Sequence, residues 1–248
     1  IQYQSGILVT KLAEQDDKVK VCYIDQTTHQ AQSSIYDRVF LAAGALGSTR
    51  IVMQSKQLYS QEVYLKSTRA FVAPMLRKKS TPLEWPYVNT EPGIFIEFKV
   101  NDLSNHWIHT QLNTPNELVL EKLGVNPKKN NMVQAIKRNI AERLIIAFCN
   151  IHSDHANGYS LTLSKSSSDD KDLLISQRRN HIASDKAIKQ ISRKLFTLGR
   201  RFGCYTLLPL IQSSFKSTHV GSTLPMTLKQ TNATDTAIMG RPKDWQRI

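Results

Sequence analysis

The sequence predicts a protein of the α+β or α/β class, in which strands and helices are mixed. Three features of the 248-residue chain support this class. A strand-like hairpin and an apolar run precede a helix within the first 55 residues, strand-like runs dominate residues 90–180, and an amphipathic helix follows from residue 184. The hydrophobic fraction of 40% and the charged fraction of 21% are typical of a globular protein.

The first 55 residues predict a hairpin, a buried strand, a tight turn and a helix. The stretches "GILVTKLAE" and "KVKVCYID" are strand-like, and the polar "EQDDK" between them predicts a hairpin turn. "TTHQAQSS" is typical of a polar loop. The run "RVFLAAG" is apolar on both faces, which predicts a buried strand in a parallel or mixed sheet. Ser48 then suits the N-cap of a helix over "TRIVMQS".

The middle of the chain predicts an antiparallel sheet with at least one helix on it. "GIFIEFKV", "HWIHTQL" and "RLIIAFCNI" are rich in apolar and β-branched residues, which indicates strands. "GYSLTLSK" and "DLLISQR" predict a further hairpin around a polar turn. In "NNMVQAIKRNIAE", Met132, Ile136 and Ile140 recur one helical turn apart, so we expect a short helix there.

A longer amphipathic helix is predicted from residue 184 onward. Its apolar face carries Ile188, Ile191, Leu195 and Leu198. Asp185 suits the positive N-terminal end, and Gly199 or Gly203 is expected to stop the helix. The later stretches "THVGSTLPM" and "MGRPKDWQRI" are typical of loops.

The charge and the cysteines restrict the class of partner and the compartment. The formal net charge of +13 is spread over separate Lys and Arg doublets, with no run of five or six like charges. We therefore expect no nucleic-acid partner. No apolar stretch reaches the roughly 20 residues that cross a bilayer, so no integral membrane association is expected. Cys22, Cys149 and Cys204 are far apart and odd in number, which fits a reducing, cytoplasmic compartment.

Two histidine pairs have a spacing that metal sites use on helices. They are His106 with His109 and His152 with His155. Both pairs lie in or beside predicted strands, where residues three apart point to opposite faces. We therefore expect ordinary sheet and loop histidines and no metal site. The sequence also contains no G-x-S-x-G nucleophile motif, so hydrolase chemistry has little support.

Two short motifs carry the strongest functional signal. In "LAAGALGS" small residues would let the backbone approach a bulky ligand, and the following helix would offer free N–H groups. A strand–helix junction without a ligand would look the same. In "HVGSTLPM" a loop histidine is followed by small and hydroxyl residues. Imidazole titrates near neutral pH, so this histidine could accept a proton from a hydroxyl, although a structural loop histidine is the alternative.

Taken together, these motifs resemble the glucose–methanol–choline (GMC) family of FAD-dependent oxidoreductases. "DRVFLAAGALGSTRIVMQS" is similar to the strand, turn and helix that return to the flavin domain in that family. "THVGSTLPM" is similar to its C-terminal loop with the active-site histidine, and the strand-rich stretch between them matches the substrate domain in order. The resemblance implies an FAD-binding mixed-sheet domain beside an antiparallel-sheet substrate domain with helices packed on it.

The resemblance also implies roles for particular residues. His219 would be the catalytic base that takes the hydroxyl proton while FAD accepts a hydride from a CH–OH group. The adenine would meet the backbone at Val9, and Ala42, Ala43 and Gly44 would lie along the dinucleotide. The resemblance implies a small alcohol as the substrate and favours sugar-like alcohols.

The implied division of the chain has three parts: a partial FAD-binding domain (1–58), a substrate-binding domain (59–212) and a partial return to the FAD domain (213–248). The family's G-x-G-x-x-G unit and its last strand and helix have no counterpart in the sequence. We therefore expect an internal fragment of a longer oxidoreductase, inactive by itself. The alternative is a non-catalytic basic module that binds an anionic polymer or a membrane surface.

Overall fold

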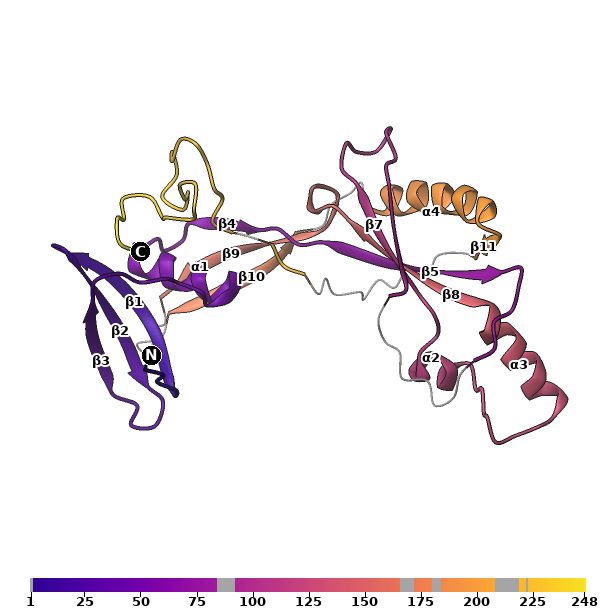
Figure 1. Ribbon diagram of the computed structural model, residues 1–248. Coiled ribbons are helices and arrows are strands. Elements are labelled where there is room, and N and C mark those ends of the chain that lie inside the picture. The colour runs from indigo at the N-terminus through magenta and orange to yellow at the C-terminus, as the bar shows by residue number, and fades with distance from the viewer. Residues whose placement is uncertain (1, 84–91, 166–171, 180–183, 208–218, 222) are drawn as a thin grey trace. The chain divides into compact units, whose positions relative to one another are not determined.

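The protein has an α+β fold, with antiparallel sheets and four α-helices among the residues described (Figure 1). The computed structural model describes residues 2–83, 92–165, 172–179, 184–207, 219–221 and 223–248. Within these ranges, no helix is both long enough and apolar enough to cross a bilayer.

The chain divides into two compact units. The first comprises residues 1–67, 158–179 and 220–248, and the second comprises residues 68–157 and 180–219. The sequence-based division placed its boundaries at residues 58 and 212. The compact units differ from it mainly in residues 158–179, which belong with the first part of the chain.

A three-stranded antiparallel sheet opens the first unit. It consists of β1 (Ile7–Gln15), β2 (Lys18–Asp25) and β3 (Ala31–Tyr36), in that order. The predicted hairpin of β1 and β2 is confirmed, and Leu12 and Val19 are buried on it. The prediction of a loop at "TTHQAQSS" is wrong in its second half, because residues from Ala31 onward form β3, which pairs with β2.

Helix α1 (Gly44–Ser55) starts earlier than predicted, and the strand expected before it does not form. Residues 38–43 adopt no regular structure, and Phe40 is 93% exposed. The apolar composition of "RVFLAAG" is typical of a buried strand, but a strand also needs a neighbouring strand to share its hydrogen bonds. Ser48 lies inside the helix and is not its N-cap, because Ala43 holds that position.

A second small sheet packs against α1. Its order is β10 (Leu173–Arg179), β9 (Gly158–Ser164) and β4 (Glu62–Leu65), and the predicted β9–β10 hairpin is confirmed. The buried residues of this core are Met53, Val63, Leu65, Leu161 and Leu163. Met53 comes from α1 and the other four from β4 and β9, so the helix is fixed to this sheet by apolar packing.

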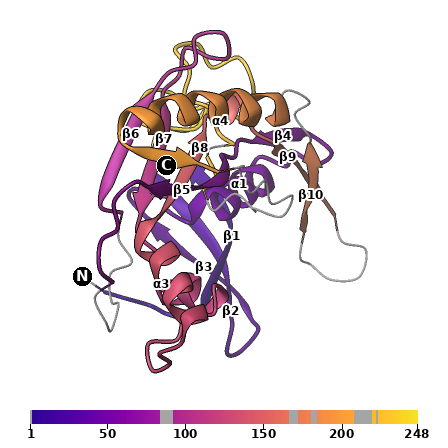
Figure 2. The same cartoon turned by 90° about the vertical axis from the view of Figure 1, so that its right-hand side faces the viewer.

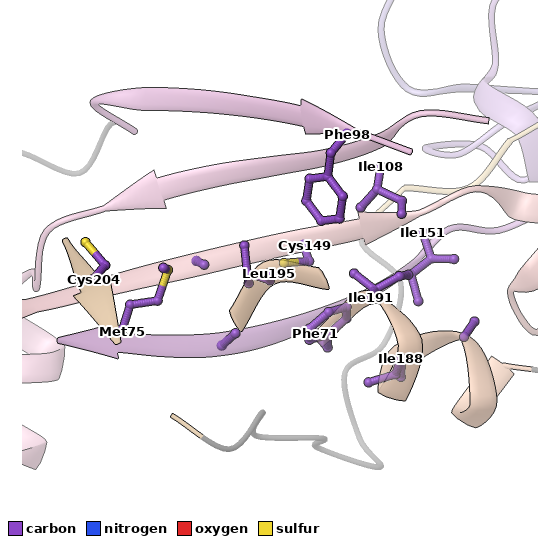
Figure 3. Close-up of a cluster of buried hydrophobic side chains, with 13 residues drawn as sticks. Phe71, Met75, Phe98, Ile108, Cys149, Ile151, Ile188, Ile191, Leu195 and Cys204 are labelled. Atoms are coloured by element: carbon purple, nitrogen blue, oxygen red, sulfur yellow. The ribbon is translucent and has the colours of Figure 1, made fainter. Parts of the chain in front are cut away.

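A five-stranded antiparallel sheet forms the second unit, covered on one face by α4 (Ser184–Arg201). The strand order is β11 (Cys204–Thr206), β5 (Arg69–Arg77), β8 (Leu144–Ile151), β7 (Ile108–Asn113) and β6 (Ile94–Phe98). Figure 2 shows α4 lying over the strands of this sheet. Figure 3 shows their shared core, in which Ile188, Ile191 and Leu195 of α4 pack on Phe71 and Cys149. The predicted apolar face of α4 is confirmed.

The remaining helices are short. Helix α2 (Glu117–Lys122) is capped by the Asn116 side chain, and α3 (Met132–Arg143) is capped by Asn131. The helix predicted in "NNMVQAIKRNIAE" is confirmed. Its expected apolar face is nevertheless exposed at Met132, Ile136 and Ile140, whereas Gln134 and Ala141 are buried.

Candidate functional site

The first part of the candidate site is the turn that leads into α1. Ala42, Ala43 and Gly44 are all exposed. Gly44 has a φ of +72°, and a Cβ atom built there would meet nothing within 4 Å. This conformation favours glycine because an L side chain would strain the backbone, not because space is short. The first turn of α1 carries no acidic side chain, so nothing there opposes a negatively charged group at the positive end of the helix.

The second part consists of Val220, Gly221, Thr223 and Leu224, of which the first two lie beside the residues before β5. Val220 forms an antiparallel bridge with Ser67, and the amide of Gly221 donates to the carbonyl of Lys66 at 2.7 Å. A Cβ atom on Gly221 would lie 3.3 Å from both the Cβ and the carbonyl oxygen of Lys66. Glycine is therefore used at this position because two backbones approach closely.

A buried pair of hydroxyl groups joins the two parts. The side chains of Thr49 on α1 and Thr223 share a hydrogen bond, although they are 174 positions apart in sequence. Thr49 also donates to the carbonyl of Ala45 at 2.6 Å. Because a hydroxyl has one proton, Thr49 must accept the hydrogen bond that Thr223 donates.

Between these parts is an open hollow of about 540 Å³. It is lined by Leu41, Ala42, Gly44, Ala45, Ser48, Val220, Gly221, Thr223 and Leu224. Most of these residues are small, so backbone atoms form much of the wall. The structure thus brings residues of the "LAAGALGS" motif together with Val220, Gly221, Thr223 and Leu224.

A second hollow of about 430 Å³ adjoins the same turn on the side of the C-terminal segment. Arg38–Leu41 contribute to it together with residues 239–242 and 246–248. The amide of Val39 donates to the carbonyl of Arg247 at 3.0 Å, and Glu14 accepts from the amide of Gln246 at 2.8 Å. The irregular stretch before α1 is thus bonded to the C-terminal segment and not to a neighbouring strand.

Lys56, just after α1, contacts the C-terminal segment at Ala233 and Trp245. Its Nζ donates to the carbonyl of Ala233 at 3.1 Å and lies 5.2 Å from the centre of the Trp245 ring. Burial lowers the pKa of Lys56 below its usual value, because the charged form loses contact with water. Figure 1 shows this segment, in yellow, beside α1 and β4.

The other predicted site residues lie outside the hollow. Ala43 is the exposed N-cap residue of α1, and Val9 pairs with Tyr23 within the β1–β2 hairpin. His219 is an exposed residue of the second unit. Its backbone carbonyl accepts from the amide and the hydroxyl of Thr68 at 3.2 and 3.4 Å.

Sequence reasoning missed the residues that connect the two motifs. Thr49 and Thr223 are the clearest example, because each looked like an ordinary hydroxyl residue beside a more conspicuous neighbour. Thr223 stands inside the quoted "HVGSTLPM", and Thr49 follows Gly47 and Ser48 in the first motif. The sequence offers one indication of their role, because each threonine lies within five residues of the small residues of its own motif.

In comparisons with known proteins, no family model and no curated protein matches the chain.

Proposed function

We propose that the chain contributes part of the active site of an FAD-dependent oxidoreductase of the GMC kind, which oxidises a CH–OH group to a carbonyl. The observation that carries the proposal is the hollow that Ala42 and Gly44 line together with Val220, Gly221, Thr223 and Leu224. These are the two stretches on which the resemblance rests, and about 175 residues separate them in the sequence. Had they been unrelated loops, nothing would require them to share a wall.

The residues of the hollow fit one portion of a dinucleotide. A flat, bulky group needs walls of small residues, and a pyrophosphate is stabilised by free N–H groups at a helix N-terminus. Gly44 with its open Cβ position and the acid-free first turn of α1 meet both needs. Ala42, Ala43 and Gly44 would hold the dinucleotide, and the hollow of about 540 Å³ takes only a part of it. When bound, FAD supplies the acceptor for the hydride.

His219 is the residue we propose as proton acceptor. It stands directly before Val220 in the sequence. Neutral imidazole accepts a proton from an alcohol hydroxyl as the carbonyl forms, and general-base catalysis of this kind contributes about 10²–10⁴ in rate. The hydrogen bonds from Thr68 fix the backbone carbonyl of His219, so the main chain at this residue is held in place.

Flavin binding and flavin reduction test the two parts of this proposal separately. The complete translation product of the reading frame is reconstituted with FAD, and flavin bleaching is followed with simple alcohols, sugars and sterols. His219→Asn should slow reduction about 10²–10⁴-fold while FAD affinity stays within a few-fold. The control is His29→Asn, since His29 lies in a surface turn with a positive φ that Asn tolerates.

Two results would contradict the proposal. A protein that binds no FAD contradicts the cofactor assignment. A flavin-loaded His219→Asn variant that is reduced as fast as the parent contradicts the role of His219 alone.

The second candidate function is binding of an anionic polymer, and α4 is the observation that favours it. Its exposed face carries Lys186, Lys189, Arg193, Lys194, Arg200 and Arg201. The helix contains a single acidic residue, Asp185, which pairs with Arg69 at 2.8 Å. Salt-dependent retention on heparin that is lost on substitution of Lys189 and Arg193 by Glu, in a protein without flavin, would favour this function.

A further inference from the structure

Two histidines and an aspartate meet at one end of the five-stranded sheet. His106 precedes β7, His152 follows β8 directly, and Asp154 lies in the 3₁₀ turn Ser153–His155. Strands β7 and β8 are antiparallel neighbours in which His109 pairs with Asn150. The start of one strand therefore lies beside the end of the other, and residues 46 positions apart become neighbours. All three belong to the second unit.

The three side chains lie close together. The rings of His106 and His152 are parallel, with centres 3.5 Å apart and an angle of 7° between their planes. Oδ2 of Asp154 lies 3.2 Å from Nε2 of His106 and 3.5 Å from Nδ1 of His152. One ligand atom from each of the three residues lies within 4.8 Å of the others.

These separations suit the shell of a small metal ion. Ligand atoms bonded tetrahedrally at about 2.1 Å lie about 3.4 Å from one another. The distances from the Asp154 oxygen to the two ring nitrogens bracket this value. Nδ1 of His152 accepts the backbone N–H of Asp154 at 3.2 Å, and an ion bound at this nitrogen takes the place of that hydrogen bond.

We propose that His106, His152 and Asp154 form a binding site for a divalent transition-metal ion, with Zn²⁺ as the ion that the donor set suits best. Imidazole with one carboxylate selects transition metals over Mg²⁺ and Ca²⁺, which prefer oxygen ligands. The three side chains are 37–48% exposed, so water has access to complete the coordination. The spacing in the sequence pairs His106 with His109 and His152 with His155, whereas the structure brings His106 together with His152.

The same sheet offers a natural comparison. His109 lies 3.1 Å from Oε1 of Glu97, much as His106 lies 3.2 Å from Asp154. Against the His109 ring packs Phe95, with ring centres 5.3 Å apart, where the other cluster has a second imidazole. A histidine–carboxylate pair alone lacks a third ligand, so we expect tight metal binding at the first cluster only.

Calorimetric titration with Zn²⁺ tests the proposal. The protein carries no affinity tag and is treated with chelator first. We expect one tight site, weakened at least about tenfold by each of His106→Ala, His152→Ala and Asp154→Asn and abolished in the triple variant. The His109→Ala variant should retain the affinity within about twofold. Because the three side chains are surface-exposed, circular dichroism should show unchanged folding.

A second readout keeps the assignment specific to histidine ligands. Electron paramagnetic resonance of the Cu²⁺-loaded protein should show nitrogen coupling that disappears in His106→Ala. The proposal is overturned if no tight site exists, if the triple variant binds Zn²⁺ as the parent does, or if His109→Ala weakens binding as much as His106→Ala. None of these results depends on flavin or on His219.

Discussion

The bond between Thr49 and Thr223 permits a sharp test of whether the two motifs form one site. Replacing Thr49 with valine keeps the shape of the side chain but removes the acceptor of the Thr223 hydroxyl proton. Thr49 is 0% exposed and Thr223 is 5% exposed, so water cannot readily replace the lost partner. A buried donor left without an acceptor costs about 1–3 kcal/mol.

Replacing Thr223 with valine should destabilise the protein less than replacing Thr49. In Thr223→Val, Thr49 still donates to the carbonyl of Ala45 and loses only a hydrogen bond that it accepted. That loss costs about 1 kcal/mol. In the double variant no donor is left unpaired, so its destabilisation should be smaller than the sum of the two single effects by about 1 kcal/mol.

Urea unfolding followed by Trp245 fluorescence measures these values. Trp245 belongs to the first unit, and the protein has two other tryptophans, Trp85 and Trp107, which are replaced by phenylalanine in the parent and in the three threonine variants of this experiment. If the single effects are equal and simply additive, the hydrogen bond does not couple α1 to the loop. Our account of the hollow would then be wrong. FAD affinity measured on the same variants would show whether the coupling extends to the cofactor.

Two further predictions concern stability. Gly199→Ala should not stabilise the second unit by the helix-propensity gain of about 1 kcal/mol, because a Cβ atom would lie 3.0 Å from Oγ1 of Thr206 and 3.2 Å from the Cys204 carbonyl oxygen, whereas the Met75 methyl at 2.7 Å can move aside. Urea unfolding followed by Trp107 measures the change, with the exposed Thr197→Ala as a control that should not destabilise. The amides of Asn232 and Thr231 hold the pKa of Asp235 below its ordinary value of 3.8, so its contribution to stability is present above that value and is lost as the pH falls through the folded pKa. Asp235→Asn should therefore flatten the acid side of the stability profile, and an unchanged profile would exclude the carboxylate as its source.

Much of the fold was readable because its elements are local. Alternation of apolar and polar residues around a polar turn predicts the β1–β2 and β9–β10 hairpins. The spacing of Ile188, Ile191 and Leu195 predicts α4. Strand β5 was missed although it is the second strand of the large sheet. Pro74 interrupts its pattern, and the strand forms because its neighbours β8 and β11 pair with it on both sides.

The candidate site was readable only in part, for a related reason. The small residues Ala42, Gly44 and Gly221 are visible in the sequence, and the structure brings them to one hollow. What joins them is a bond between Thr49 and Thr223, and no local pattern signals a partner 174 residues away. The strand expected in "RVFLAAG" does not form for the same reason, because composition alone does not show whether a neighbouring strand is present to share its hydrogen bonds.

The two ligand sites proposed for this chain lie in different compact units, so each can be tested without the other. The hollow beside α1 is built entirely from the first unit, and the histidine cluster entirely from the second. Each arises where two segments distant in sequence are fixed by a bond or a strand register that the sequence does not display. Substitutions at Thr49 or Thr223 should therefore leave Zn²⁺ affinity unchanged, and substitutions at His106 should leave FAD affinity unchanged. A variant that altered both would mean that the two units communicate, which neither proposal requires.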